Sequence, residues 1–190
     1  MKSVPQATPV LRIPKKSGKL QTVIDCCKRN NNMVKDVTPF PNQDQIRMDV
    51  ARVKYHSKID LLNTYEQVQI KLEDVWKMAF TTIYGTYISL VMQQGDYNAP
   101  VTFQHLMMVI FRDHIGHFIY VYLDDIFIFS DTLEEHELHL RTVFQMVEEA
   151  DFHLEKDKCN LYTEKLDCLG HLIHQRGIYT DRDKMSQIHN

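Results

Sequence analysis

Two adjacent aspartates, Asp124 and Asp125, stand between two runs of β-branched and aromatic residues, 118–123 and 126–130. These runs predict two strands joined by a tight turn. Such a turn normally takes Asn-Gly, Asp-Gly or Gly-Gly, because positive φ is needed there. Here no glycine relieves the strain, and carboxylates about 6 Å apart repel by roughly 3 kcal/mol at an effective dielectric of about 20. A divalent cation removes that repulsion, since Mg²⁺ accepts oxygen ligands. An exposed acidic turn without a function is the alternative that these residues alone leave open.

A third carboxylate, Asp60, lies near the C-terminal end of a strand predicted over residues 54–61. If this strand neighbours the 118–130 hairpin in one antiparallel sheet, three carboxylates meet at one edge. That is the smallest ligand set for two metal ions, one lowering the pKa of an attacking hydroxyl and both stabilising an in-line phosphoryl displacement. A general acid–base pair is the competing interpretation, but two adjacent ionised carboxylates on an open turn suit metal better.

The elements that must position these residues follow from hydrophobic period and turn chemistry. Strands are predicted over 10–13, 20–24, 54–61 and 68–72, with a hairpin over 79–87 punctuated by Gly85 and further strands over 161–179 with a turn at 175–177. Helices are predicted around 43–50, after Asn98-Ala99-Pro100, and after Thr132, where Glu135 completes a capping box. The order predicts an α+β fold with an antiparallel sheet covered by helices on one face.

Bulk composition places the chain among globular proteins. Its 190 residues, 44% hydrophobic and 25% charged, suffice for one sizeable domain or two small subdomains. No apolar N-terminal region follows Met1-Lys2-Ser3, and the longest apolar run, 118–123, is far too short to span a bilayer. The four cysteines form no C-x-x-C pair, so reduced thiols are expected. We therefore expect an intracellular protein, cytoplasmic or nuclear, with no membrane partner.

The net charge of −3 hides an asymmetry along the chain. Residues 1–58 hold 12 Lys and Arg against 4 Asp and Glu, and the remainder holds 10 against 21. A basic N-terminal part and an acidic remainder suit a protein that binds a polyanion with one part and cations with the other.

The ten histidines do not predict a zinc site. The spacing of His136 and His139 does not follow the H-x-x-x-H pattern that places two imidazoles on one helical face, and Cys168 with His171 has no second paired cluster. We interpret the isolated histidines as solvated or helix-surface residues.

Several motifs in order resemble one known family. The string Y-L-D-D-I-F-I-F-S, followed by E-E-H-x-x-H-L-R and C-L-G-H, resembles the reverse transcriptase of gypsy-like long-terminal-repeat retrotransposons and of retroviruses. Asp60-Leu61 with Tyr65 and Gln67 matches the family's first catalytic motif, and the run from Gly95 to Gln104 matches its helix entry. Each motif alone is weak, but the ordered set covers nearly the whole chain.

The resemblance implies a right-hand polymerase fold, with fingers over about 1–52 and 72–100 and palm over about 53–71 and 101–190. It implies that Asp60, Asp124 and Asp125 hold two Mg²⁺ ions, with Mn²⁺ as a substitute. The implied reaction adds deoxynucleotides (dNTPs) to a primer 3′ end on an RNA or DNA template. A dimer or a polyprotein context is left open.

Other roles also come from the resemblance. Tyr65 would be the steric gate that excludes a ribose 2′-hydroxyl. Three further groups of residues are implied: Lys15 or Lys16 at the triphosphate, Gln94 and Gly95 at the nucleotide, and Leu169-Gly170-His171 in a primer-gripping hairpin.

The chain also departs from the family pattern. Gln21 and Cys27 stand where arginines are usual, and Asp96-Tyr97 stands where Leu-Thr is usual. Neutral glutamine cannot replace the paired donors of a guanidinium that cradles a triphosphate. The family's polymerase continues into a helical thumb and an RNase H domain, which we expect to be absent from these 190 residues. The alternative function is therefore a truncated, catalytically inactive remnant that binds at most nucleic acid or a partner.

Overall fold

A computed structural model describes residues 7–14, 18, 20–174 and 177–180. The chain divides into two compact units, Met1–Thr38 with Asn63–Phe103, and Pro39–Leu62 with Gln104–Asn190. Residues 39–52, grouped with the fingers from sequence, belong to the second unit because their helix packs in its core. The names fingers and palm for these units stay a prediction.

The first unit is built on a four-stranded sheet in the order β2-β1-β4-β5. The two predicted hairpins are confirmed: β1 (Thr8–Pro14) pairs antiparallel with β2 (Leu20–Ile24), and β4 (Ala79–Thr82) pairs with β5 (Gly85–Ile88). A parallel contact between β1 and β4 joins the hairpins into one sheet. The short helices of this unit are α1 (Cys27–Asn31), η1 (Thr64–Gln67) and η2 (Val75–Met78).

The strand predicted over residues 68–72 is wrong. The segment makes one isolated bridge, between Gln69 and Val91, and hydrogen bonds from Ile70 N to Leu90 O and from Met92 N to Val68 O. The chain then turns, and the side chain of Leu72 is 90% exposed. An alternating segment this short, paired on one side only, does not extend into a strand.

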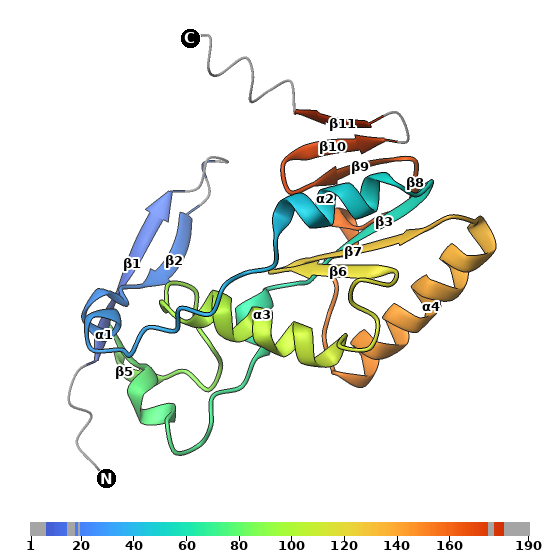
Figure 1. Ribbon diagram of the computed structural model, residues 1–190. Helices are drawn as coiled ribbons and strands as arrows, with labels where there is room; N and C mark the ends of the chain where they lie inside the picture. The colour runs from blue at the N-terminus through green and yellow to red at the C-terminus, as the bar shows by residue number, and fades with distance from the viewer. Residues whose placement is uncertain (1–6, 15–17, 19, 175–176, 181–190) are drawn as a thin grey trace, which may run out of the picture. The chain divides into compact units, whose positions relative to one another are not determined.

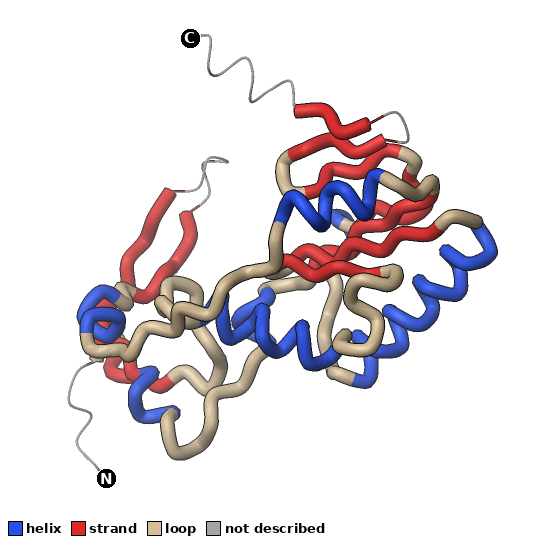
Figure 2. Tube along the Cα trace, in the orientation of Figure 1, coloured by secondary structure: helices blue, strands red, loops and turns tan. Residues whose placement is uncertain are grey.

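The second unit contains the strand with Asp60 and the hairpin with Asp124. Its four-stranded sheet has the order β6-β7-β3-β8, with every neighbouring pair antiparallel. The strands are β3 (Tyr55–Asp60), β6 (Ile119–Tyr122), β7 (Asp125–Ser130) and β8 (Asn160–Thr163). The predicted antiparallel sheet is therefore confirmed, and Figure 2 shows these strands together in red.

Two long helices lie on one face of this sheet. They are α3 (Ala99–Ile110), which begins in the first unit and ends in the second, and α4 (Leu133–Glu149). Ile126 of β7 borders one small internal cavity together with Met107 of α3 and Val147 of α4. Figure 1 shows α4 along the sheet on the opposite side from α2.

The other face of the sheet is covered by α2 (Gln43–Ala51) and a second sheet of order β11-β10-β9. The helix was predicted from sequence, but its place on this face was not. The strands of the small sheet are β9 (Lys165–Cys168), β10 (His171–His174) and β11 (Gly177–Thr180). A buried apolar cluster holds these layers together: Ile46, Val50, Phe127, Phe129, Leu166, Cys168 and Ile173.

Helix α4 begins with the predicted capping box. Thr132 Oγ1 accepts from Glu135 N at 3.2 Å, and Glu135 Oε2 accepts from Thr132 N at 3.3 Å. We expect Thr132→Ala to lower the free energy of unfolding by about 1 kcal/mol, because one backbone N–H at the helix start loses its acceptor. Urea unfolding followed by circular dichroism measures this. The control Thr142→Ala, further along the same helix, should be neutral or slightly stabilising, and equal losses in both variants would refute the cap's role.

Two histidines contradict the expectation that histidines lie at the surface. His136 of α4 is fully buried, with Nε2 2.7 Å from Ser57 Oγ and Nδ1 2.9 Å from Ser130 Oγ. His56 of β3 is also fully buried, with Nε2 2.8 Å from Val50 O. Half-buried His139 shares Ser130 Oγ at 2.8 Å. These imidazoles therefore tie α2 and α4 to the sheet.

No helix in the described part of the chain is long and apolar enough to cross a membrane.

Candidate active site

The pairing of β3 with β7 brings the predicted carboxylates to one end of two neighbouring strands. Asp60 lies directly opposite Asp125, and Leu61 N donates to Asp124 O at 3.3 Å. Directly opposed residues point to the same face of a sheet, as do residues two apart along a strand. Asp60 and Asp125 therefore share the face of Phe127, away from α4. Asp60 is 8% exposed, Asp125 is half-buried and Asp124 is exposed.

The turn before β7 consists of Leu123 and Asp124, so Asp125 is the first residue of the strand and not a turn residue as predicted. Leu123 takes the positive φ of 54° that glycine normally supplies. This conformation costs a non-glycine residue roughly 1 kcal/mol. Gln104 of α3, itself buried, offsets that cost. Its Oε1 accepts from Leu123 N at 2.7 Å and its Nε2 donates to Val121 O at 3.0 Å.

Two lysines that sequence reasoning missed neutralise two of the carboxylates. Lys58 Nζ is 2.8 Å from Asp125 Oδ2, and Lys158 Nζ is 3.3 Å from Asp60 Oδ1. Lys58 stands two residues before Asp60 on the same strand, so strand alternation placed it on the face of the carboxylates. Lys158 comes from η3 (Lys156–Lys158), far along the chain, and no sequence signal connects it with Asp60.

The carboxylates of Asp60 and Asp124 at this strand edge influence the ionisation of Asp125. Burial raises the pKa of Asp125; its bond to Lys58 opposes this, while the charges of Asp124 and Asp60 raise it further. The pKa of Lys158 is also raised, mainly by the charge of Asp60. Asp125 is therefore within electrostatic reach of Asp60, Asp124 and Lys58, and Lys158 is within reach of Asp60.

The donor set fits a hard divalent cation, because all three groups are carboxylates. Within the described residues, no group of three or more His, Cys, Asp or Glu side chains is already gathered closely enough to hold a metal ion. The ammonium of Lys158 stands at Asp60 instead. Since that side chain is 62% exposed, it can turn to solvent without leaving a buried, unpaired charge. The residues therefore fit Mg²⁺ once Lys158 has withdrawn.

We expect the affinity of the chain for Mg²⁺ to weaken by up to about tenfold for each pH unit below the raised pKa of Asp125, because a protonated oxygen is not a ligand. Titration calorimetry with MgCl₂ across the acidic to neutral range measures this. Asp125→Asn should bind more weakly and with less dependence on pH, whereas exposed Asp131→Asn should follow the wild type. An affinity that is independent of pH would contradict the assignment of Asp125 as a ligand.

The proposed primer-gripping residues lie in the hairpin between β9 and β10. Leu169 and Gly170 have φ values of 54° and 74°, the signs that a type I′ turn requires at both central positions. His171 Nδ1 is 3.3 Å from Leu169 O. Leu169 packs against the same apolar cluster as Tyr122, which precedes the aspartate turn. The hairpin and the carboxylates thus belong to one unit.

The predicted nucleotide-binding residues that the structure describes lie in the first unit. Tyr65 in η1 meets Phe103 edge to face, with ring centroids 6.0 Å apart. Gln94 and Gly95 are exposed, and Gly95 has a φ of 97° that favours glycine. Lys15 and Lys16 lie outside the described residues.

Comparison with known proteins identifies the family of this chain. The model of the family "Reverse transcriptase (RNA-dependent DNA polymerase)" matches residues 13–173. The chain belongs to the reverse transcriptase family.

Its relatives are polyproteins of mobile elements. The chain is 35% identical over 189 residues to the retrovirus-related Pol polyprotein from transposon 297 of Drosophila melanogaster, covering 97% of this chain and 18% of the relative. It is 31% identical to the corresponding polyprotein from transposon opus of the same fly, over 97% of this chain and 19% of the relative. The chain therefore spans about a fifth of the length of these curated relatives.

Solved structures of foamy viral protease–reverse transcriptase share the fold. A complex with double-stranded DNA has a TM-score of 0.88 and 28% identity, covering 97% of this chain and 32% of that chain. A complex with an RNA/DNA hybrid has a TM-score of 0.86 and 27% identity, covering 97% and 25%. The retroviral polymerase fold expected from the resemblance is thus confirmed.

Proposed function

We propose that this chain is the polymerase part of a retrotransposon reverse transcriptase and that it adds dNTPs to a primer 3′ end. The observation that carries the proposal is the register of β3 and β7, which sets Asp60 opposite Asp125 with Asp124 in the adjoining turn. In a member of this family, three carboxylates at one strand edge are suited to holding two divalent cations. Asp60, Asp124 and Asp125 would hold these cations, which would supply a lowered pKa for the primer 3′-hydroxyl and stabilisation of the charge on the phosphoryl group in transfer.

The chain's own residues prepare that site. Gln104 holds the backbone of the Leu123–Asp124 turn, which fixes where the carboxylate of Asp124 projects. Lys58 orients the carboxylate of Asp125 through a hydrogen bond in a half-buried position. Lys158 neutralises Asp60, and its exposed side chain could withdraw to make room for a cation. The Leu123–Asp124 turn and the carboxylate of Asp125 are therefore held in place beforehand, which lowers the cost of assembling the site around the reacting groups.

The substrate roles in this proposal follow the family motifs. Tyr65 excludes the 2′-hydroxyl of a ribonucleotide, and Gln94 with Gly95 binds the nucleotide beside Lys15 or Lys16. Leu169, Gly170 and His171 grip the primer. The foamy viral relatives were solved with double-stranded DNA and with an RNA/DNA hybrid, which supports a template–primer duplex as the partner of this chain. The polyprotein relatives support a polyprotein context.

The second candidate function is an inactive remnant that binds nucleic acid or a partner protein. Gln21 and Cys27, each standing in place of a usual arginine, favour it, because the incoming triphosphate loses guanidinium contacts.

Primer extension on an RNA template with dNTPs and Mg²⁺ distinguishes the two candidates. The polymerase proposal expects extension that stops when a chelator removes the metal and resumes with Mg²⁺ or Mn²⁺. In a second arm, Tyr65→Val should raise ribonucleotide incorporation relative to dNTP incorporation, because less bulk then opposes the 2′-hydroxyl. If the folded chain binds the duplex but does not extend the primer, only the inactive remnant stays as a candidate function.

A further inference from the structure

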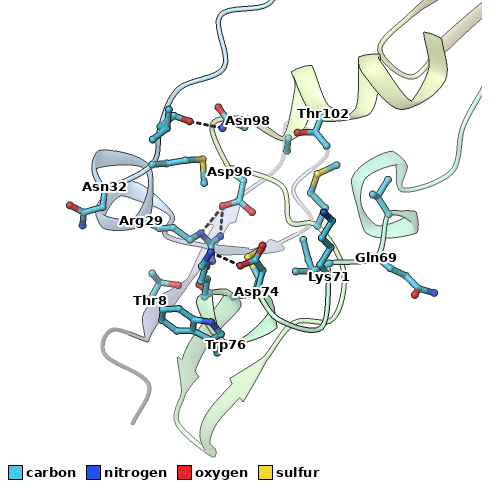
Figure 3. A pocket seen from close by; sticks show the side chains of 18 residues that line it. Thr8, Arg29, Asn32, Gln69, Lys71, Asp74, Trp76, Asp96, Asn98 and Thr102 are labelled. Atoms are coloured by element: carbon cyan, nitrogen blue, oxygen red, sulfur yellow. Dashed lines mark hydrogen bonds and ion pairs between the residues drawn. The ribbon is translucent and has the colours of Figure 1, made fainter. Parts of the chain in front are cut away.

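The loop that carries Gln94 and Gly95 is held by a largely buried ion pair between Arg29 and Asp96. Gln93 and Asp96, on either side of these two exposed residues, are 7% and 8% exposed. The two central residues, Gln94 and Gly95, therefore face solvent, whereas Gln93 and Asp96 on either side of them are buried in the first unit. Arg29 of α1 reaches both flanking side chains, and Figure 3 shows its guanidinium directed at Asp96.

The bonds of Arg29 form a buried network. Its Nε donates to Asp96 Oδ1 at 2.7 Å, and one terminal nitrogen donates to Gln93 Oε1 at 3.1 Å and to Cys26 Sγ at 2.9 Å. The side chains of Arg29 and Asp96 are only 11% and 7% exposed. A buried ion is strongly unfavourable without its partner, so each charge holds the other in place.

Asparagines add backbone contacts to the same loop. Asn30 Nδ2 donates to Gly95 O at 2.9 Å, and Asn30 Oδ1 accepts from Tyr97 N at 2.9 Å. Asn98 Nδ2 donates to Val34 O at 2.8 Å, and its Oδ1 accepts from Asp36 N at 3.0 Å. The segment that follows β2 is thus hydrogen-bonded to the loop at Gly95, Tyr97 and Asn98.

A pocket lies beside the contact between Arg29 and Asp96. Arg29, Asp96 and Met92 border a cavity of about 830 Å³ within the first unit (Figure 3). On this side of the loop, the carboxylate of Asp96 is held by its bonds to Arg29. At Gly95, an added Cβ would lie 3.5 Å from Cys26 Sγ, so the backbone also runs close against α1.

We propose that Arg29 and Asp96 are positioning residues that hold Gln94 and Gly95 in the shape that binds the incoming nucleotide. The proposal rests on the proposed polymerase function and adds to it a pair that touches no substrate. Asp96 is one of the positions at which the chain departs from the family pattern, so its carboxylate is not part of that pattern. A guanidinium is required because its planar fork serves Asp96, Gln93 and Cys26 at once, which an ammonium cannot do.

Arg29→Lys tests this, because it keeps the charge and loses the fork. The first readout is hydrogen exchange of the Tyr97 amide, with amides of α4 as the internal reference for folding. The second readout is the affinity for dTTP. It is measured on the chain bound to a duplex of poly(rA) and an oligo(dT) primer that ends in a dideoxynucleotide. The affinity of the chain for that duplex is measured separately. The matched control is Arg141→Lys, which alters an exposed ion pair with Glu137.

The expected result is at least tenfold faster exchange at Tyr97 and at least tenfold weaker dTTP binding, with duplex affinity and α4 exchange within twofold of wild type. Arg141→Lys should leave all four quantities within twofold. Asp96→Asn, which keeps the size and one acceptor oxygen, should change exchange and dTTP binding in the same direction by a smaller factor. It also serves as the test if Arg29→Lys does not fold.

Unchanged exchange at Tyr97 in folded Arg29→Lys would overturn the proposal, because Arg29 would then not hold the loop. Faster exchange with unchanged dTTP affinity would also overturn it, since the shape of the loop would not matter to the nucleotide. A wild-type chain that binds the duplex but no dTTP would refute the nucleotide role together with the proposed polymerase function. Loss of dTTP binding in the variants alone would leave that function standing.

Discussion

Asp124→Asn is expected to reduce primer extension by a factor of about a thousand or more. The amide has almost the size of the carboxylate but carries no charge, so it removes one proposed anionic metal ligand without disturbing the Leu123–Asp124 turn. Loss of about 4 kcal/mol of transition-state stabilisation corresponds to that factor, and a metal site supplies several kcal/mol. Single-nucleotide extension of a labelled primer on RNA, followed in time, measures it.

The matched control for this substitution is Asp131→Asn, which makes the same chemical change at an exposed position just before α4. It should leave extension within twofold of wild type. Thermal unfolding of all three proteins shows whether any loss comes from misfolding. Comparable extension by wild type and Asp124→Asn would exclude Asp124 from catalysis and remove the main support for the proposed metal site.

Acidification is expected to destabilise the second unit through His136. Burial, with smaller effects of the nearby His139 and His56 charges, lowers the pKa of His136 from 6.5 to about 4. Because the folded-state pKa is depressed, the stabilisation is complete above 6.5 and is lost as the pH falls toward 4. Each unit in that interval contributes about 1.4 kcal/mol for one proton, so about 3 kcal/mol of unfolding free energy disappears.

Urea unfolding at a series of pH values measures the effect. His136→Gln removes the titrating imidazole, so the unfolding free energy should depend less on pH, by about one bound proton, between 6.5 and 4. The control His117→Gln replaces an exposed histidine and should retain the wild-type slope. If His136→Gln kept the full slope, the acid sensitivity would have to arise elsewhere in the chain.

Much of this site could be predicted because its signals are local. A run of β-branched residues on both sides of Asp124 fixes a strand, a turn and a strand, and the spacing of Thr132 and Glu135 fixes the start of α4. Alternation along β3 places Asp60 on a definite face of the sheet. These patterns depend on neighbours within a few residues, which a single sequence displays directly.

The features that escaped prediction depend on distant partners. Lys158 meets Asp60 after a separation of 98 residues, and Arg29 meets Asp96 after 67. His136 was taken for a surface histidine because its serine partners, Ser57 and Ser130, come from two different strands. From sequence alone, a polar side chain is predicted to be exposed, because a buried one needs a hydrogen-bond partner that only the tertiary structure reveals.

The lysine at Asp60 has a consequence for the cations that the proposed metal site would accept. Lys158 is a competitor attached to the chain, and a group on a short flexible arm acts as if present at an effective concentration on the order of millimolar. A monovalent ion offers the carboxylate the same single charge and gains nothing by replacing it. A divalent ion brings twice the charge to three carboxylates, so it displaces the ammonium at comparable concentrations. In the proposed metal site, the tethered lysine would therefore select for ion valence and would set a concentration threshold below which the carboxylates remain with their own cation.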